Sequence, residues 1–569
     1  MKRFLTIITI LAIALCTQAQ NAPNCHRLYL IDKKDSPYSI DKPEQFLSPR
    51  ALEKRARFNI AITEEDLPIN PTYIRQILNI DSTIQIISQS KWTNTLVVYC
   101  PKGTVPDSVL NLRFVNYSKP VGHYQPYIDT ISITPYTHPF PTSTKKKTQE
   151  VWTPEQYGNS YAQIAIHNGD QLHAAGFKGE GMLIAVIDAG WGFFDTLSCF
   201  KSLYDNGQIK GYRNLVPDHR GLYDTTELHG SYVTSIMATT WPDSLIGTAP
   251  EADYYFIRSE NADIEEPLEE DLWMMAVELA DSLGADVINS SLGYTTFDDS
   301  IRFPSDYRDC NGNSLISQVA AKAVEKGILV CVSAGNSGDK PWHFVGRPAD
   351  ARNVLSIGAI DVDAQLAPFS SVGPSFDGRT KPDVVSVGWN TFVVNQYECT
   401  AQGNGTSFSS PMMAGLSACL WQSLPDKSAT ELIQIIKESS HNYSTPNNYV
   451  GYGIPDVYQA YLSHTTGIRT PKMDESQVTV SPNPCETHCT LFSQTPLNQV
   501  QINLYNTTGQ LIQHTSGITI SASHQLDVSQ LKSGIYLLQI TGYNQKGERL
   551  STFQKHTNQY TTTLFLKHR

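Results

Sequence analysis

The feature that most constrains the fold of this chain is a group of apolar strands that each end in polar, glycine-rich residues. Residues 181–187 form an uninterrupted apolar run, which is typical of a strand buried on both faces. The apolar segments 287–288 and 328–332 have the same character. The three segments lead into DAG at 188–190, NSSLG at 289–293 and SAGN at 333–336. Because parallel strands end at one edge of a sheet, we predict an α/β fold, a parallel sheet with helices on both faces, and a site at that edge.

A second constraint comes from GTSFSSP at 405–411, which places a serine near the start of a helix. Proline inside a helix clashes with the carbonyl four residues earlier. We therefore expect Pro411 in the first turn of a helix that continues through Trp421, with Ser407 at or just before its start. The positive end of the helix dipole would lie beside the Ser407 hydroxyl. Such a serine is a candidate nucleophile if the fold supplies a base and a carboxylate; otherwise it is a common Gly-Ser helix cap.

Three further residues supply the groups that this serine needs. Asp188 ends the first strand, Asn336 ends another, and His229 opens the segment HGSYV, which leads into a helical pattern. Taken singly, they could be a strand-end cap, a turn residue and a surface histidine. Taken together with Ser407, they are the components of an acyl-transfer site. The G-x-S-x-G pattern of another hydrolase class is absent, because Ser409 stands where its second glycine would be.

The order of these motifs, with their flanking residues, resembles the subtilisin-like serine proteases (subtilases) over about residues 163–455. The resemblance implies a protein or peptide substrate and a catalytic triad of Asp188, His229 and Ser407. It implies that Asn336 and the Ser407 N–H stabilise the oxyanion. It also implies main-chain binding of an extended substrate by Ser290, Ser291, Leu292 and Gly293. One residue departs from the family pattern, because Ala189 stands where a hydroxyl residue is usual.

The alternative function is a catalytically silent surface-binding protein that keeps the same fold. A second open question is substrate preference. Glu265, Glu266, Glu269 and Glu270 precede or begin a helix, and in the subtilase frame they lie along the non-primed side of the cleft. They would favour basic substrate side chains, or they would only stabilise the helix dipole.

The two ends of the chain predict export. Residues 1–19 have the layout of a signal peptide, with cleavage near Ala19. Residues 20–150 show a small α+β pattern and a linker, and their position resembles that of a subtilase propeptide, which blocks the cleft as an intramolecular inhibitor. We predict removal of this region between about residues 133 and 157. Lys145 to Lys147 could mark the cut or could simply be a solvated lysine run.

We expect the catalytic domain over residues 151–464, a linker over 465–476 and a β-sandwich over 477–569. The SPNP opening, the YNTTGQ turn and LKSGIYLLQI resemble the C-terminal sorting domain of the type IX secretion system. That resemblance implies the outer-membrane secretion machinery of a Gram-negative bacterium as a partner, and secretion or display at the cell surface. A generic adhesive or carbohydrate-binding module is the alternative.

Composition and charge limit the kinds of ligand and partner that the chain can bind. The net charge of −12 gives no basic footprint for nucleic acid. No cofactor is predicted; structural calcium, frequent in subtilases, matches no motif here. Of the ten cysteines, Cys331 and Cys419 fall in expected core elements, and Cys485 and Cys489 are close enough in sequence to pair.

Overall fold

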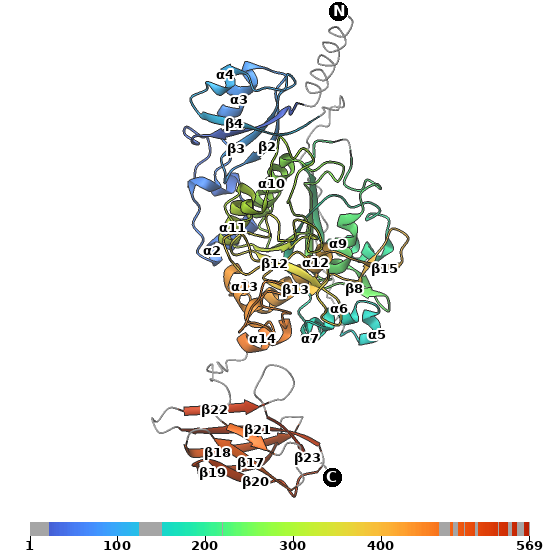
Figure 1. The fold of residues 1–569 in the computed structure, drawn as a ribbon, viewed down its shortest axis with the longest axis vertical. Coiled ribbons are helices and arrows are strands. Elements are labelled where there is room, and N and C mark those ends of the chain that lie inside the picture. The colour runs from blue at the N-terminus through green and yellow to red at the C-terminus, as the bar shows by residue number, and fades with distance from the viewer. Residues whose placement is uncertain are drawn as a thin grey trace, which may run out of the picture. The chain divides into compact units, whose positions relative to one another are not determined.

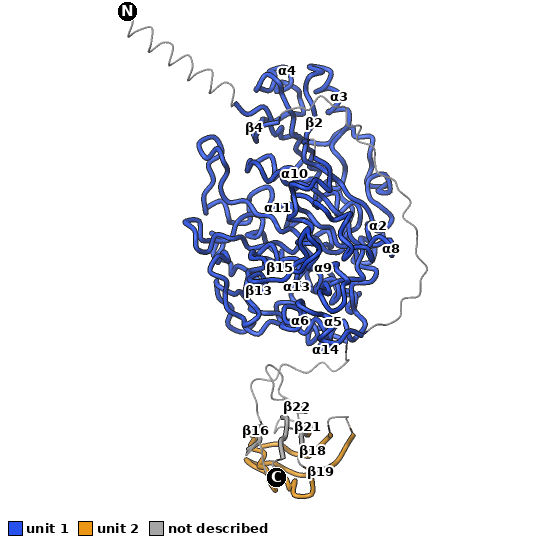
Figure 2. Tube along the Cα trace, turned by 90° about the vertical axis from the view of Figure 1, so that its right-hand side faces the viewer, with its two compact units in different colours: residues 1–466 blue, residues 467–569 orange. Residues whose placement is uncertain are grey.

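The computed structural model describes residues 22–124, 151–218 and 220–465, and then 478–481, 487–493, 496–506, 510–532, 534–543, 549–554 and 563–567. The chain forms two compact units, residues 1–466 and 467–569 (Figure 2). The predicted signal peptide, the lysine run at 145–147 and the linker at 465–476 lie almost entirely outside the described residues. Among the described residues, no helix combines the length and apolar character that a membrane crossing requires.

A parallel sheet forms the centre of the first unit, as predicted (Figure 1). Its seven strands lie in the order β13-β12-β11-β10-β5-β9-β6. The chain adds β6 and β9 on one side of β5 and then β10 to β13 on the other, so β5 and β10 flank the point where the direction of winding changes. The strands are β5 (Leu183–Asp188), β6 (Ile209–Asn214), β9 (Asp253–Arg258), β10 (Val287–Ser290), β11 (Leu329–Ser333), β12 (Leu355–Ile360) and β13 (Val384–Val387).

The helices around this sheet form two groups. In one group, α12 contacts α9, α14 and strands β10 to β13; in the other, α10 contacts α11. Every residue of β5, β10, β11 and β12 is buried, which explains the uninterrupted apolar runs. The main helices are α9 (His229–Ala238), α10 (Pro267–Leu283), α11 (Leu315–Glu325), α12 (Thr406–Ser423), α13 (Ala429–Glu438) and α14 (Val457–Thr465).

The expected start of the serine-bearing helix needs correction. Helix α12 begins at Thr406, so Ser407 is its second residue and Pro411 lies beyond the first turn. The proline removes one helical hydrogen bond, the bond to the carbonyl of Ser407. The hydroxyl of Ser291 donates to that carbonyl at 2.8 Å instead. A donor from a distant part of the chain therefore lets the helix extend past its proline.

The N-terminal region folds as the predicted α+β unit. Its four strands form an antiparallel sheet in the order β2-β3-β1-β4. Strand β3 is buried on both faces, because Leu96 and Val98 pack against helix α3 while Val97 and Tyr99 join the core of the catalytic region. The elements are β1 (Cys25–Leu30), α2 (Pro49–Arg57), α3 (Pro71–Ile80), β2 (Gln85–Ser90), β3 (Thr95–Tyr99), α4 (Asp107–Leu110) and β4 (Val115–Gly122).

The second unit consists of strands, as the alternating pattern predicted. One sheet has the order β16-β17-β20, and the other contains β19-β18-β21-β22, with β23 paired to β21. Cys489 and Leu491 from the first sheet share a core with Ile502 and Leu538 from the second. Cys485 and most of the predicted turn at 507–510 lie outside the described residues. The strands are β16 (Val478–Ser481), β17 (His488–Ser493), β18 (Leu497–Asn506), β19 (Leu511–Ile520), β20 (Ser523–Asp527), β21 (Gly534–Tyr543), β22 (Arg549–Gln554) and β23 (Thr563–Lys567).

Candidate active site

An acid and an imidazole meet at the carboxyl edge of the sheet. Asp188 is the last residue of β5 and is fully buried, and His229 is the first residue of α9. Asp188 Oδ1 lies 2.7 Å from Nδ1 of His229 and also accepts the N–H of Ala189 at 2.8 Å. Because a carboxylate accepts and does not donate, Nδ1 carries the proton and Nε2 is the basic nitrogen. Asp188 Oδ2 has no hydrogen-bond partner among the described residues.

The surroundings of His229 set its proton affinity. Desolvation of the ring lowers its pKa, but the charge of Asp188 and the hydrogen bond to it act in the opposite direction. Glu227 and Glu260 add negative charge nearby, and the net result is a pKa above the ordinary 6.5. The side chain is 32% exposed, so part of the imidazole is accessible from the surface. His229 is therefore placed to accept a proton and to be stabilised once it carries the charge.

The candidate nucleophile lies on the opposite side of this edge. Ser407 is in the first turn of α12, and its hydroxyl donates to the carbonyl of Ser291 at 3.2 Å. No hydrogen bond joins Ser407 to His229 among the described residues, but the ring of the adjacent Phe408 lies 6.4 Å from the imidazole, centroid to centroid. In enzymes without a bound substrate, hydrogen bonds between catalytic groups are often long and shorten on binding.

Two N–H donors converge beside the candidate nucleophile. Asn336 Oδ1 accepts the N–H of Thr406 at 2.8 Å and its hydroxyl at 3.0 Å. A backbone N–H can only donate, so this contact fixes the amide orientation and turns Nδ2 outward. A methyl group added to Gly405 would lie 3.6 Å from both Asn336 Nδ2 and the Ser407 nitrogen. Both donors therefore border one small space, which suits a developing oxyanion.

The four predicted substrate-binding residues, Ser290 to Gly293, lie at and after the end of β10 and are not equivalent. The Ser290 side chain is buried and accepts from Trp273 at 2.9 Å, while the Ser291 hydroxyl binds the Ser407 carbonyl. The Leu292 carbonyl accepts from Ser333 at 3.3 Å. Gly293 is exposed, and added atoms at its Cβ position would meet only a carbonyl at 3.5 Å. The side chains of Ser290 and Ser291 and the carbonyls of Ser291 and Leu292 are therefore occupied within the protein, and Gly293 is the exposed residue of the four.

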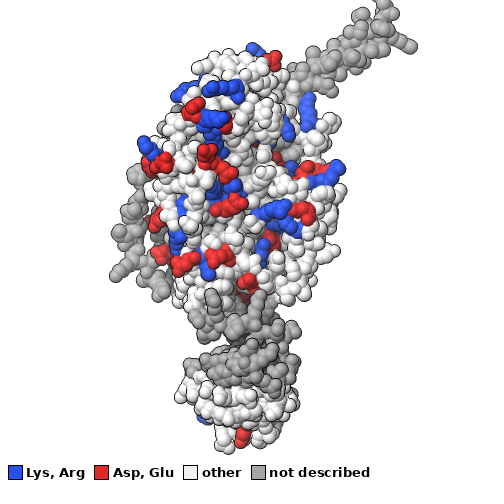
Figure 3. Space-filling view, turned by 90° about the vertical axis from the view of Figure 1, so that its left-hand side faces the viewer, with Lys and Arg blue, Asp and Glu red and all other residues white. Residues whose placement is uncertain are grey.

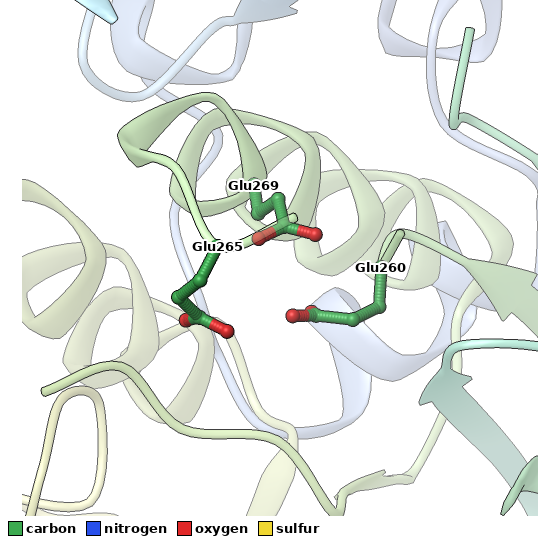
Figure 4. Close-up of side chains that lie close together, drawn as sticks. All are labelled: Glu260, Glu265 and Glu269. Atoms are coloured by element: carbon green, nitrogen blue, oxygen red, sulfur yellow. The ribbon is translucent and has the colours of Figure 1, made fainter. Parts of the chain in front are cut away.

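A cluster of three carboxylates borders the same edge (Figure 4). Glu260, Glu265 and Glu269 point toward one another, with oxygens that lie within 4.8 Å. Burial raises the pKa of Glu260 to about 8, of Glu265 to about 7 and of Glu269 to about 10. Neighbouring carboxylates add to each shift, since Glu265 acts on Glu260, Glu260 acts on Glu269, and Asp298 and Glu270 act on Glu265. Among the described residues this is the set of side chains that could hold a cation.

The structure separates the two explanations of the predicted acidic residues. Glu266 and Glu269 form a capping box at the start of α10, and Glu270 lies 3.5 Å from Arg347, so three of the four have structural partners. Glu265 and Glu269 both point into the carboxylate cluster, and Glu265 is the one of the four that lies before the capping box. Sequence reasoning missed Glu260, although it follows β9 by two residues and so belongs to the same sheet edge. It also missed Glu227, which raises the pKa of His229.

Comparison with known proteins covers three parts of the chain. A model of the subtilase family matches residues 179–453, which include all four site residues. A model of the peptidase S8 propeptide domain of Bacteroidota matches residues 26–131, and a model of a secretion system C-terminal sorting domain matches residues 479–550.

Three relatives illustrate the similarity. Subtilisin NAT of Bacillus subtilis subsp. natto is 27% identical over 314 residues, which cover 54% of this chain and 74% of the relative. Subtilisin DY of Bacillus licheniformis is 28% identical over 300 residues, with 52% and 97% covered. The thermophilic serine proteinase of Bacillus sp. strain AK1 is 31% identical over 327 residues, with 54% and 69% covered.

The balance of effects at His229 predicts a measurable titration. We expect a pKa above 6.5 in the wild type and below 6.5 in Asp188→Asn, because desolvation then outweighs the remaining charges. NMR of the protein with labelled histidine measures both values. His167 and His173 are buried, which lowers the pKa of each to about 4, and they serve as internal controls that should not move. An unchanged His229 titration in Asp188→Asn would contradict the assigned interaction.

Proposed function

The chain belongs to the subtilase family of serine proteases, and from that membership we propose that Ser407 is its catalytic nucleophile. The protein is made with a propeptide and a secretion sorting domain. The observation that carries the proposal is the hydrogen bond of 2.7 Å between His229 and the buried Asp188, which lie at the same sheet edge as Ser407. A serine is a weak nucleophile at neutral pH, and this pair supplies a base with a fixed tautomer.

The proposed reaction proceeds in two stages. The Ser407 oxygen attacks the carbonyl carbon of the scissile bond while Nε2 of His229 takes the hydroxyl proton. The resulting oxyanion accepts hydrogen bonds from the Asn336 side-chain amide and from the Ser407 backbone N–H. As the C–N bond breaks, His229 gives its proton to the leaving amine. Water then attacks the acyl-enzyme with the same base, which releases the new carboxylate and restores Ser407.

The acidic surroundings favour the charged intermediate in this sequence. His229 is positively charged while the tetrahedral intermediate exists, and Asp188 and Glu227 stabilise that charge. The same interactions raise the pKa of the free base, so activity falls on the acid side once the pH drops below that raised value. We further propose endopeptidase action. A substrate that pairs with the protein near Gly293 would bind through its own main-chain N–H and C=O groups, so a free substrate terminus would not be needed.

The propeptide is proposed to inhibit through a charged interface on α10. Arg27 binds Asp271 through two hydrogen bonds of 2.7 Å, and both side chains are buried. Glu278 accepts from Ser90 and from the N–H groups of Lys91 and Trp92. The end of β4 continues to His123, which binds Glu266 beside the acidic cluster. The propeptide therefore covers α10 and places its last described residues, His123 and Tyr124, beside Glu266 and Glu269.

Chemical labelling tests the catalytic assignment. We expect wild type, once processed, to hydrolyse denatured protein and to react with a phosphonate probe, because the probe requires an activated serine. Ser407→Ala should lose both the labelling and at least about 10³-fold of the hydrolysis. Ser409→Ala is the matched control, since its hydroxyl bonds within the helix to the Thr406 carbonyl.

Two results would contradict this assignment. Labelling that survives Ser407→Ala would place the nucleophile elsewhere. A fully processed wild type that neither labels nor hydrolyses would favour the alternative, a silent binding protein.

The buried contact between the propeptide and α10 predicts that removal of one charge, that of Asp281, lowers stability strongly. Asp281 lies 2.8 Å from Arg55 and 3.2 Å from Lys91, and it is fully buried. Asp281→Asn leaves these cations without that carboxylate, so we expect a loss of about 3–5 kcal/mol in the stability of the propeptide-bound form. Urea denaturation of Ser407→Ala chains, which cannot process themselves in the proposed mechanism, measures the change.

Glu65→Gln is the control for this measurement. Glu65 also pairs across the interface, with Lys322 at 3.1 Å, but its side chain is 52% exposed. We expect a change within about 0.5 kcal/mol. Equal effects of Asp281→Asn and Glu65→Gln would show that burial does not govern the interface.

The second unit is proposed to direct the protein to the outer-membrane secretion machinery of a Gram-negative bacterium. Its match to a sorting-domain model supports this destination. Figure 3 shows described acidic and basic side chains mixed over one face of the first unit, and few of either on the second. A chain that ends at Thr466 keeps the first compact unit, so we expect folded protein that remains in the periplasm. Cell fractionation with the full chain as control measures this, and normal surface delivery of the truncated chain would contradict the proposal.

A further inference from the structure

The carbonyl of Ser407 lacks the donor that a helix normally provides. In an α-helix, the carbonyl of each residue accepts the N–H of the residue four positions later. For Ser407 that residue is Pro411, which has no N–H. The hydroxyl of Ser291 donates to this carbonyl at 2.8 Å, from a position 116 residues earlier in the chain. The first turn of α12 therefore depends on a side chain from the sheet.

A neighbouring amide directs the Ser291 hydroxyl. Nδ2 of Asn289 donates to Ser291 Oγ at 3.1 Å, and Oδ1 of Asn289 accepts from Ser410 at 2.8 Å. Because the amide occupies the hydroxyl oxygen as a donor, the single Ser291 proton is left for the Ser407 carbonyl. Asn289 and Ser410 are fully buried, so water does not compete for these bonds. The end of β10 and the first turn of α12 are thus joined by a directed chain of hydrogen bonds.

The same residue also contacts the Ser407 side chain. The carbonyl of Ser291 accepts from the Ser407 hydroxyl at 3.2 Å, while the Ser291 hydroxyl binds the Ser407 carbonyl. One residue, directly after β10, therefore contacts the proposed nucleophile at both its main chain and its side chain. A shift of this turn would move the Ser407 hydroxyl and the Ser407 N–H together, because both belong to the same residue.

We propose that Ser291 is a positioning residue, which fixes the first turn of α12 so that the Ser407 hydroxyl and N–H lie where the reaction needs them. This inference rests on the proposed role of Ser407 as nucleophile. It assigns to the Ser291 hydroxyl a role in compensating for Pro411, distinct from any main-chain contact that Ser291 makes with substrate. Loss of this hydroxyl lowers the rate of the chemical step and leaves substrate affinity nearly unchanged.

A double-mutant cycle between Ser291→Ala and Pro411→Ala tests the proposal. Ser291→Ala removes the donor, and Pro411→Ala supplies a backbone N–H that can take its place. We expect Ser291→Ala alone to lower kcat about tenfold with KM within about twofold, which corresponds to the loss of one hydrogen bond at the reacting residue. In the Pro411→Ala background the same substitution should lower kcat by no more than about threefold.

Three further variants make the result specific. Ser291→Thr keeps the hydroxyl and should retain most of the activity. Ser290→Ala removes a neighbouring hydroxyl that binds Trp273, and Pro411→Ala should leave its effect unchanged. If Ser291→Ala does not accumulate as folded protein, Ser291→Cys, with a weak donor, replaces it in the cycle.

Two outcomes would overturn the positioning role. The first is an equal loss of kcat from Ser291→Ala in both backgrounds, and the second is a rise in KM with unchanged kcat, which would make Ser291 a substrate contact. If the wild type reacts with the phosphonate probe, either of these results leaves Ser407 as the nucleophile. Failure of wild type to label would instead remove the proposed function itself.

Discussion

The buried carboxylate of Asp188 is the constraint on which the site depends. It ends strand β5, it is fully enclosed, and one of its oxygens has no hydrogen-bond partner among the described residues. Ala189 supplies a main-chain N–H but lacks the hydroxyl that subtilases usually carry at this position. A buried charge with so few donors is stabilised mainly by a nearby group that can become positive. His229 is that group, so the strand and the first residue of α9 are electrostatically coupled.

The other half of the site depends on a compensation for proline. Pro411 interrupts the hydrogen bonds of α12 at the carbonyl of Ser407, and Ser291 restores the missing bond from the end of β10. The two halves meet because β5 and β10 are adjacent strands that flank the change in winding direction. Acid, base and nucleophile thus come from segments that are distant in sequence, and the sheet brings them to one edge.

Much of this arrangement could be predicted from the sequence because its signals are local. Uninterrupted apolar runs indicated strands buried on both faces, and glycine-rich endings indicated where Asp188 and Asn336 would lie. The start of α12 could not be predicted from local rules, because the donor that satisfies Ser407 comes from Ser291. The partners of Asp281 could not be predicted either, because arginine and lysine residues such as Arg55 and Lys91 are usually exposed. Their burial becomes visible only when the N-terminal region packs on α10.

The chemistry of that packing fits a segment that must leave. A face of α10 made only of apolar side chains would expose an adhesive surface once the propeptide departed. Instead, Asp271, Glu278 and Asp281 bind propeptide donors, alongside apolar side chains such as Val97 and Tyr99 that join the core of the catalytic region. While the propeptide is bound, each has a donor that offsets part of its desolvation, and burial still raises the pKa of Asp271 and of Glu278. The same residues can therefore stabilise the precursor strongly and leave the mature surface polar, because paired charges tolerate both burial and water.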